Sequence, residues 1–337
     1  MIPAIPWGSW GVWWESIFGE RIPSYFAALC CAFVFCTWFA VRWAKRIRLD
    51  HDVLIDLSLI SVITGVAGAR IAHVLFDGYL MDYVHMCTDY TQVGWQVTRG
   101  YCESDLVQGV WDEAAQVCHP SGPDCFAWAK FWQGGLTWYG GMFLAVGYAM
   151  YFLRKEGFPQ LKALDLAGNV LPLGLFFGRM GCFFGGCCFG QPTDHWIGVV
   201  FPEWSPASEQ QWRHHLLEEP SLPSLPVLPA QLFEGFGSLL IALFAIGYLH
   251  PRKRFDGHTF CISMTLYAVL RFGLEALRDD QRGGLLALST SQWIGIVIVV
   301  GVAFFWRWAS QRAERERAAL LAKQAPPASG EDAPAAA

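Results

Sequence analysis

The sequence predicts an all-α, polytopic membrane protein with about seven transmembrane helices and an exported insert that contains cysteines. Of the 337 residues, 54% are hydrophobic and 16% are charged, against about 25% charged in soluble globular domains. Several apolar runs reach the roughly 20 residues that a helix needs to cross a hydrocarbon core of about 30 Å. Lysine and arginine gather at alternate turns between these runs. The composition therefore argues against a soluble enzyme.

Seven apolar runs are long enough to be transmembrane helices. Three contain no Asp, Glu, Lys or Arg and cover residues 22–41, 131–153 and 283–306. Four others are interrupted by one or two charged residues and cover residues 53–75, 163–180, 230–250 and 257–277. Asp56 and Asp165 lie at the inner ends of their runs, where interfacial water is expected to solvate them.

The distribution of basic residues predicts the orientation. Of the 24 basic residues, 15 follow runs one, three, five and seven, within residues 42–48, 154–162, 252–254 and 307–323. Because such clusters face the cytoplasm, we expect a periplasmic N-terminus and a cytoplasmic C-terminus. Segment 1–24 has no basic leader before an apolar core, so no cleavable signal peptide is expected. Its tryptophans resemble an interfacial belt: Trp7, Trp10, Trp13 and Trp14.

The predicted order of segments follows from these runs. The interfacial segment 1–24 precedes two helices within 25–76, a periplasmic insert at 77–130, two helices within 131–180, a Pro-rich outer segment at 181–229, three helices within 230–308 and a cytoplasmic tail at 309–337. No chemistry is assigned to the tail, which is polar and then rich in Ala and Pro.

The insert carries eight acidic residues and four cysteines, namely Cys87, Cys102, Cys118 and Cys125. Four cysteines in an oxidising compartment predict two disulfides, and all three pairings stay open. A metal site is disfavoured there because the spacing has no C-x-x-C pair.

Five charged residues from four helices are predicted to lie in one layer at the outer ends of the helices: Arg70, Arg179, Glu234, Arg271 and Glu275. Arg271 and Glu275 are one helical turn apart and can pair. A single arginine near a helix end can simply extend to the interface. Three arginines at one depth favour an anion site, because guanidinium groups bind phosphate in a bidentate fashion. A phospholipid headgroup is the expected anion.

Two glycine-rich stretches, Gly134–Gly141 and Gly178–Thr193, flank this layer. Glycine permits tight turns and a close approach of the backbone to a ligand, but small residues also allow helices to pack closely. The first stretch fits both interpretations. The second contains Arg179 and three cysteines, and this favours function. Those cysteines, Cys182, Cys187 and Cys188, fit a disulfide or packing role, reactive thiols or, less well by spacing, metal ligands.

On these residues the chain resembles the prolipoprotein diacylglyceryl transferases, bacterial enzymes of the inner membrane. Gly178–Thr193 resembles the signature of that family. Further matching segments follow in order: Ser24-Tyr25, Gly68–Arg70, Gly134–Gly141, Pro229–Glu234 and Arg271–Arg278. The insert and the tail are expected to lie outside the resemblance.

The resemblance implies transfer of a diacylglyceryl group from phosphatidylglycerol to the lipobox cysteine thiol of a prolipoprotein signal peptide, with formation of a thioether and release of glycerol phosphate. It implies catalytic roles for Tyr139, Arg271, Glu275 and Tyr25. It also implies that phosphatidylglycerol binds to a second group of residues, Arg179, Arg70, Cys182, Gly190 and Glu234. Membrane lipid and the prolipoprotein are the implied partners, and no cofactor, metal or nucleic acid is expected.

The sequence departs from the family pattern at three places. Many members have His where this chain has Tyr139, Asn where it has Cys182, and Asn-Gly-Glu where it has Gly185-Gly186-Cys187. A histidine accepts a proton near neutral pH, whereas a tyrosine is ordinarily protonated up to about pH 10. Tyr139 could instead donate a hydrogen bond to phosphate. These departures leave two alternatives open: a non-catalytic membrane protein that binds lipid or lipoprotein, and a thiol redox membrane protein.

Overall fold

A computed structural model describes residues 24–95, 99–103, 109–131, 135–219, 221–278, 284–285 and 288–324. The expected tryptophan belt and Gly134 lie outside these residues. The chain divides into two compact units, Arg48–Pro159 and the combination of Met1–Ile47 with Gln160–Ala337. The first is called the insert unit below, and the second is called the bundle unit.

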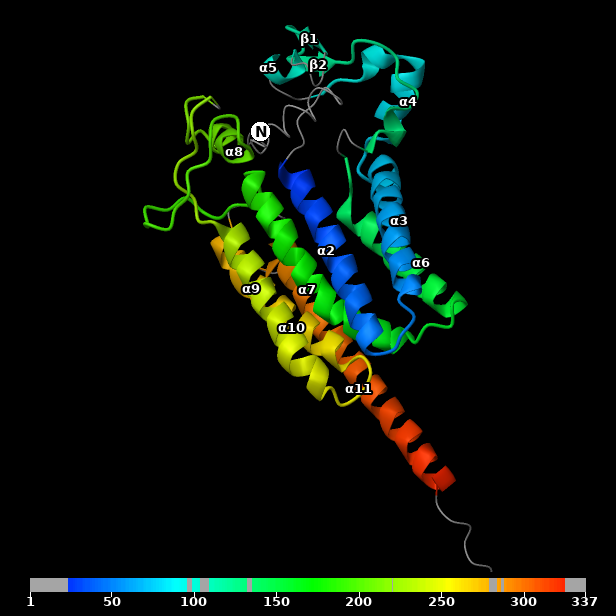
Figure 1. The fold of residues 1–337 in the computed structure, drawn as a ribbon. Coiled ribbons are helices and arrows are strands. Elements are labelled where there is room, and N and C mark those ends of the chain that lie inside the picture. Colours follow the sequence, from blue (N-terminus) through cyan, green and yellow to red (C-terminus); the bar gives the residue numbers. More distant parts are fainter. Residues whose placement is uncertain are drawn as a thin grey trace, which may run out of the picture. The chain divides into compact units, whose positions relative to one another are not determined.

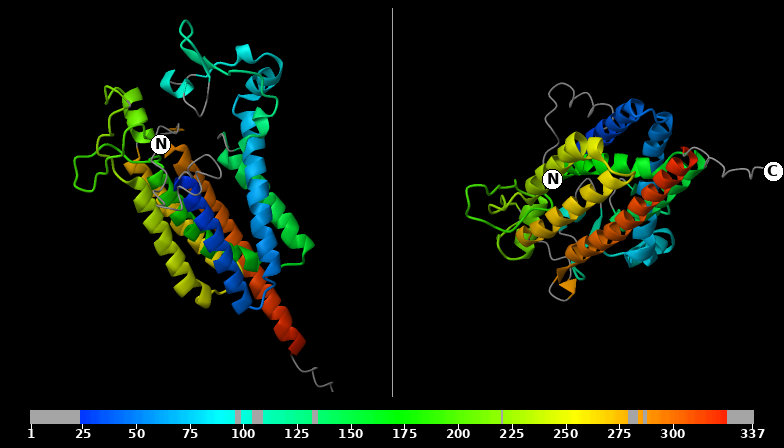
Figure 2. Two further views of the ribbon diagram at one scale, coloured as in Figure 1. Left: turned by 45° about the horizontal axis from the view of Figure 1, so that its top comes forward. Right: turned by 90° about the horizontal axis from the view of Figure 1, so that it is seen from below.

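The bundle unit is built from long helices that lie side by side (Figures 1 and 2). Its long helices are α2 (Ser24–Arg46), α7 (Gln160–Phe184), α9 (Ala230–Phe244), α10 (His258–Leu274) and α11 (Thr290–Gln324). Helix α7 packs against α2, α9 and α10, and α11 packs against α10. Close approach depends on small residues, because a Cβ at Gly168 would lie 2.7 Å from the Phe260 Cα.

Six helices in the described part of the chain are long and apolar enough to cross a membrane. They are the five helices of the bundle unit, with α9 extended to Arg252 and α10 to Leu277, and α3 (Asp52–Phe76) of the insert unit. This confirms the predicted all-α membrane fold. The run at 131–153 forms α6 (Trp138–Lys155), whose 18 residues end in Arg154 and Lys155. A seventh membrane crossing by α6 remains a prediction.

Asp165 corrects one expectation about the inner helix ends. Its side chain is fully buried, not solvated at the interface. It accepts hydrogen bonds from the Lys253 Nζ at 3.0 Å and from the Thr259 backbone N–H, at the start of α10, at 2.9 Å. A carboxylate at the N-terminus of a helix is favoured by the helix dipole. Asp165 therefore fixes α7 to α10.

The insert unit consists of α3 and α6, packed together, and of the segment between them. A Cβ at Gly68 would lie 2.6 Å from the Gly140 carbonyl oxygen, and a Cβ at Gly140 would lie 2.2 Å from the Ala72 Cβ. A Cβ at Gly141 would lie 2.8 Å from the carbonyl oxygen of Gly65. The first glycine-rich stretch thus serves close helix packing at Gly140 and Gly141.

The insert folds into short elements that disulfides hold together. They are α4 (Leu80–Thr88), a 3₁₀ turn at Tyr90–Gln92, α5 (Arg99–Cys102), the antiparallel strands β1 (Val110–Asp112) and β2 (Val117–His119), and a second 3₁₀ turn at Ala127–Ala129. The bonded pairs are Cys87–Cys125 and Cys102–Cys118. This confirms the prediction of two disulfides and selects one of the three pairings.

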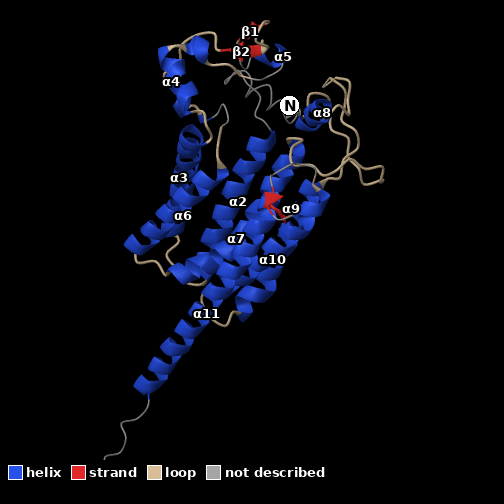
Figure 3. Ribbon diagram, turned by 180° about the vertical axis from the view of Figure 1, so that it is seen from behind, coloured by secondary structure: helices blue, strands red, loops and turns tan. Residues whose placement is uncertain are grey.

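The outer segment that follows α7 has a small aromatic core. Phe189, Phe201, Ala207 and Val227 are buried together, and Phe183 packs against them. Helix α8 (Pro206–Arg213) contributes Ala207 and begins at Ser205, whose side chain accepts a hydrogen bond from the Ser208 N–H. Figure 3 shows that helices dominate and that the strands are few; the second pair is β3 (Gly284–Leu285) with β4 (Leu288–Ser289).

Candidate functional site

The end of α7 is built by a glycine turn that brings two cysteines together. The Gly186 N–H donates to the Phe183 carbonyl, and the Cys187 N–H donates to the Cys182 carbonyl, both at 3.1 Å. Gly186 has a φ of 66°. This is the Schellman pattern, in which a left-handed glycine ends the helix and the residue after it folds back over the last turn. The turn therefore sets Cys187 beside Cys182.

Cys188 joins this pair through an unusual backbone conformation. Its φ is 62°, in the left-handed region that non-glycine residues seldom occupy and that costs about 1–3 kcal/mol. The three Sγ atoms of Cys182, Cys187 and Cys188 lie within 4.8 Å of one another, and all three residues are half-buried thiols. Hydrogen bonds from Cys182 and Cys187 lower the pKa of the Cys188 thiol, and the positive charges of Arg179 and Arg278 lower it further.

Glu234 lies at the centre of a buried charged network beside the thiols. Its side chain is 1% exposed. Its Oε1 accepts hydrogen bonds from the Arg179 Nη2 at 2.8 Å and from the Tyr267 Oη at 2.9 Å. The Arg278 Nη1 lies 3.8 Å from its Oε2. Helices α7, α9 and α10 thus each contribute to one ion network, because a buried carboxylate is stable only with such partners.

Arg271, in the last turn of α10, and Glu275, directly after that helix, form the expected pair one turn apart. The Arg271 Nη1 lies 2.8 Å from the Glu275 Oε2, but the angles are not those of a hydrogen bond. Both terminal nitrogens of Arg271 are buried and make no hydrogen bond in the part of the chain that the structure describes. Hydroxyl groups of Ser289 and Ser291 hold the Glu275 carboxylate. Arg271 is therefore oriented by Glu275, and its terminal nitrogens are able to donate to a ligand.

The loop after the thiols is fixed by close backbone contacts. A Cβ at Gly190 would lie 2.5 Å from the Leu277 carbonyl oxygen and 2.9 Å from the Leu228 Cβ. The Gln231 Nε2 donates to the Cys187 carbonyl at 2.7 Å. These contacts explain why position 190 must be glycine, and a lipid contact at Gly190 remains a prediction.

Tyr25, at the start of α2, lies near the thiols. Its ring approaches Gly181, where a Cβ would lie 3.1 Å from the Tyr25 Cδ2. It is close enough to Cys182 and Arg179 to interact with them electrostatically, and it is 42% exposed. The structure therefore brings Tyr25 to the same site as Arg179, Glu234 and the thiols.

Arg70 belongs to the insert unit and is held by backbone carbonyls. Its guanidinium donates to Trp128 at 2.7 Å, Ala127 at 2.6 Å and Gly135 at 3.2 Å. It also lies over the ring of Tyr83. These bonds give it a structural role in anchoring the insert to α3, so its membership of the predicted three-arginine layer remains a prediction.

Tyr139 lies in the first turn of α6, also in the insert unit. It is 44% exposed, and its ring makes an edge contact with Trp138. Nearby, the Thr137 hydroxyl donates to the Asp77 carboxylate, which is 2.9 Å from the His73 Nδ1. Hydrogen bonds from Thr137 and His73 lower the pKa of Asp77. The sequence interpretation did not single out this His–Asp pair.

Three residues of the bundle site were missed by the sequence interpretation: Gln231, Tyr267 and Arg278. The sequence contained a signal for each of them. Tyr267 precedes Arg271 by four residues, the spacing that places helical residues on one face, and Arg278 ends a segment that matches the family pattern, Arg271–Arg278. Gln231 lies in another matching segment, Pro229–Glu234, but no role was assigned to it there.

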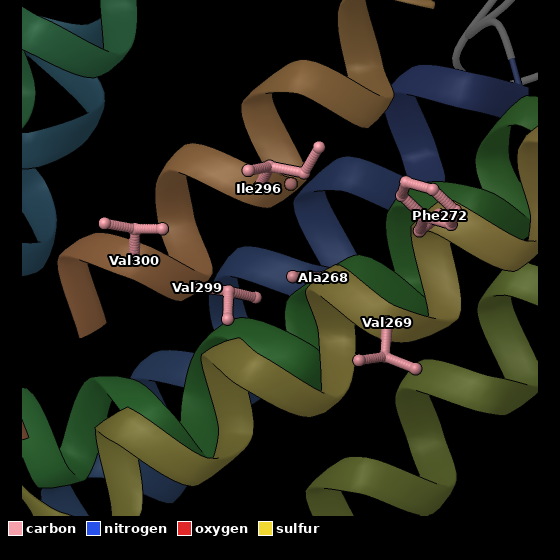
Figure 4. A pocket seen from close by; sticks show the side chains of 7 residues that line it. Ala268, Val269, Phe272, Ile296, Val299 and Val300 are labelled. Atoms are coloured by element: carbon pink, nitrogen blue, oxygen red, sulfur yellow. The ribbon is translucent and has the colours of Figure 1, made fainter. Parts of the chain in front are cut away.

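An apolar groove lies between α10 and α11 (Figure 4). It has a volume of about 240 Å³. Its lining consists of Ala268, Val269, Phe272, Gly295, Ile296, Val299 and Val300. Only dispersion contacts are possible there, so the groove suits an acyl chain and carries no headgroup specificity.

The sequence matches a known family along most of its length. The family model described as prolipoprotein diacylglyceryl transferase matches residues 15–98 and 119–308. Only residues 99–118 of the insert fall between the matched parts, so the expectation that all of 77–130 lies outside the resemblance was too broad.

Relatives with the same description are similar along most of the chain. A phosphatidylglycerol–prolipoprotein diacylglyceryl transferase 2 of Clostridium perfringens is 26% identical over 286 residues, which cover 85% of this chain and 90% of the relative. A phosphatidylglycerol–prolipoprotein diacylglyceryl transferase of Neisseria gonorrhoeae is 36% identical over 195 residues, which cover 54% of this chain and 68% of the relative.

Proposed function

The chain belongs to the prolipoprotein diacylglyceryl transferase family, and from this premise we propose that it transfers the diacylglyceryl group of phosphatidylglycerol to a prolipoprotein. The acceptor is the thiol of the lipobox cysteine. The products are a thioether and glycerol phosphate. The observation that carries the proposal is Arg271, whose buried guanidinium has two terminal nitrogens without hydrogen bonds inside the described chain.

Arg271 and Arg179 supply the positive charge that this reaction needs. Negative charge grows on the phosphate as its bond to the glycerol carbon breaks, and fixed cations stabilise that charge. Arg179 is held by Glu234 at 2.8 Å and Arg271 by Glu275 at 2.8 Å. Each guanidinium is thus oriented before lipid binds, so little reorganisation is needed during the reaction.

The remaining predicted residues have supporting roles in the proposal. Tyr25 and Cys182 border the lipid site beside Arg179. Gly190 permits the tight loop that holds this border in place. Tyr139 donates a hydrogen bond from its exposed phenol to the substrate. Arg70 anchors the insert to α3 through the carbonyls of Ala127, Trp128 and Gly135, and its predicted contact with lipid is part of the proposal.

The proposed location is the bacterial inner membrane, with the N-terminus in the periplasm and the C-terminus in the cytoplasm. The basic clusters at 42–48, 154–162, 252–254 and 307–323 support this orientation. The two disulfides of the insert also suit the oxidising periplasm.

Reconstitution tests the proposal directly. The purified protein is placed in phosphatidylglycerol vesicles with a synthetic lipobox peptide, and the peptide mass and released glycerol phosphate are measured together. We expect a gain of one diacylglyceryl group per peptide and an equal amount of glycerol phosphate. A peptide with serine in place of cysteine is the control. Lipid binding without either product would instead support the non-catalytic alternative.

A further inference from the structure

The three thiols at the end of α7 have a geometry that the lipid site alone does not require. Their sulfur atoms lie within 4.8 Å of one another. Three sulfurs bound to one zinc ion at about 2.3 Å lie roughly 3.8 Å apart in a tetrahedral arrangement. The thiols are therefore close to the spacing of a metal site.

Two features of the backbone hold the thiols at that spacing. The glycine turn sets Cys187 against the last turn of α7, where Cys182 lies. Cys188 is then directed back to both by a left-handed φ of 62°. The Gln231 side chain fixes the Cys187 carbonyl at 2.7 Å. The arrangement is preorganised, as metal sites require.

Two positively charged side chains lie near the thiols. Arg179 and Arg278 are both close enough to act on Cys188. Three thiolates and one divalent cation carry a net charge of −1, which these arginines offset. Zinc prefers four ligands, and sites with three protein ligands keep the fourth position open for water or substrate.

We propose that Cys182, Cys187 and Cys188 bind one zinc ion, and that its open fourth position takes the lipobox cysteine of the protein substrate as a thiolate. The second half of this inference rests on the proposed transferase function. It replaces the expectation from the sequence that no metal is bound. Many family members have His at the position of Tyr139, and a histidine can accept the thiol proton. In this chain the zinc ion would supply the thiolate instead.

The bonds formed and broken can be followed atom by atom. The substrate S–H bond breaks as a Zn–S bond forms, and the proton goes to water. The sulfur then attacks the carbon of the diacylglyceryl group that is bonded to the phosphate oxygen of phosphatidylglycerol. The new C–S bond forms as the C–O bond breaks, and the electron pair leaves with glycerol phosphate. The Zn–S bond then breaks as the neutral thioether leaves zinc. Zinc keeps its charge throughout, so no oxidant or reductant is needed.

Cobalt substitution tests the site without any turnover. The full-length protein in detergent, with the two disulfides of the insert intact and the other cysteines reduced, is stripped with a chelator and titrated with Co²⁺. Thiolate-to-cobalt absorption reports the number of thiolates, and the visible bands report tetrahedral coordination. We expect one Co²⁺ per chain bound by three thiolates, displaced by Zn²⁺. Changing Cys182, Cys187 and Cys188 to Ser together should abolish binding. Matched substitutions at Cys30, Cys31 and Cys36 in α2 should preserve it.

A lipobox peptide added to the cobalt form then tests the open position. We expect the cysteine peptide to raise the thiolate absorption from three thiolates to four, and the serine peptide to leave it unchanged. Absence of metal binding by the reduced protein would overturn the site. If the cysteine peptide leaves the cobalt spectrum unchanged, the proposal that the open position binds the lipobox cysteine is wrong. If the spectrum responds but vesicles yield no thioether, the transferase proposal fails and the zinc site stands.

The pH profile of transfer gives a second readout. A free thiol with a pKa of about 8.5 is only a few per cent thiolate at pH 7, whereas a metal-bound thiol is already deprotonated. Removing zinc should therefore lower transfer on the order of tenfold at pH 7. The deficit should shrink as the pH approaches 8.5, because the free thiol then ionises without help. An equal loss at both pH values would contradict the proposal.

Discussion

Arg271 is buried on α10, and neither of its terminal nitrogens makes a hydrogen bond within the described chain. We expect Arg271→Ala to lower transfer by about 10²–10³-fold, as the loss of one fixed charge donor does elsewhere. Arg271→Lys should recover only part of this, because an ammonium group cannot bind phosphate in a bidentate fashion. Thioether formation in phosphatidylglycerol vesicles measures both.

Arg252→Ala is the matched control for Arg271. Arg252 lies at the opposite end of α9 from Glu234 and stacks over Tyr248 at 4.4 Å. It should keep wild-type transfer. Equal activity of Arg271→Ala and Arg252→Ala would remove Arg271 from the site.

A substitution at Tyr139 tests whether its phenol donates a hydrogen bond to the substrate or accepts a proton from it. If the phenol only donates to the substrate, Tyr139→Phe should lower transfer by about tenfold, the value of a hydrogen bond of about 1.4 kcal/mol. A general base would contribute about 10²–10⁴-fold. We expect the smaller loss, with an unchanged pH profile of transfer. A loss above a hundredfold that grows at low pH would show that Tyr139 accepts the proton.

Part of the bundle site could be predicted from sequence because it depends on local geometry and helix depth. Arg271 and Glu275 are one turn apart, and Arg179 and Glu234 lie at the same end of the bundle unit because Arg179 is near the end of α7 and Glu234 is near the start of α9. The hydrogen bond from Tyr267 to Glu234 joins α10 to α9. Such a contact depends on how two helices rotate against each other, and the sequence of neither helix specifies this.

Among the elements, α3 and α6 depend most on glycine. A Cβ at Gly140 would lie 2.2 Å from the Ala72 Cβ, so Gly140→Ala forces the helices apart and should destabilise the protein by about 1–3 kcal/mol. Gly147, on the same helix, has no such neighbour within 4 Å. Gly147→Ala should be neutral or stabilising by up to about 1 kcal/mol. Thermal unfolding in detergent compares the two; a similar change in both would contradict close packing at Gly140.

Asp165 connects three elements at the inner end of the bundle unit. Asp165→Ala leaves the buried Thr259 N–H without its acceptor and removes one of the two carboxylates that contact Lys253, which should cost about 1–3 kcal/mol. Asp256 contacts the same Lys253 at 2.6 Å but is partly exposed, so Asp256→Ala should cost at most about 1 kcal/mol. Denaturation midpoints measure both. The buried pair has no special role if the two variants unfold alike.

The elements also show where sequence interpretation stops. Helix positions and the number of disulfides followed from hydropathy and cysteine count. The pairing Cys87–Cys125 with Cys102–Cys118 did not, because the short strands β1 and β2 and helix α5 bring Cys102 to Cys118, and the sequence shows no strong signal for them. The burial of Asp165 was missed for a similar reason, since its partners Lys253 and Thr259 are distant in sequence.

At the scale of the whole molecule, orientation in the membrane is the decisive prediction. The basic clusters and the disulfides of the insert agree on one topology. Green fluorescent protein joined to the C-terminal end should fluoresce, because it folds in the cytoplasm. Alkaline phosphatase inserted at the exposed turn near Ser121 should be active, because it requires an oxidising compartment. The reverse pair of results would place Arg179, Arg271 and the thiols on the cytoplasmic side, where a periplasmic lipobox cysteine could not reach them.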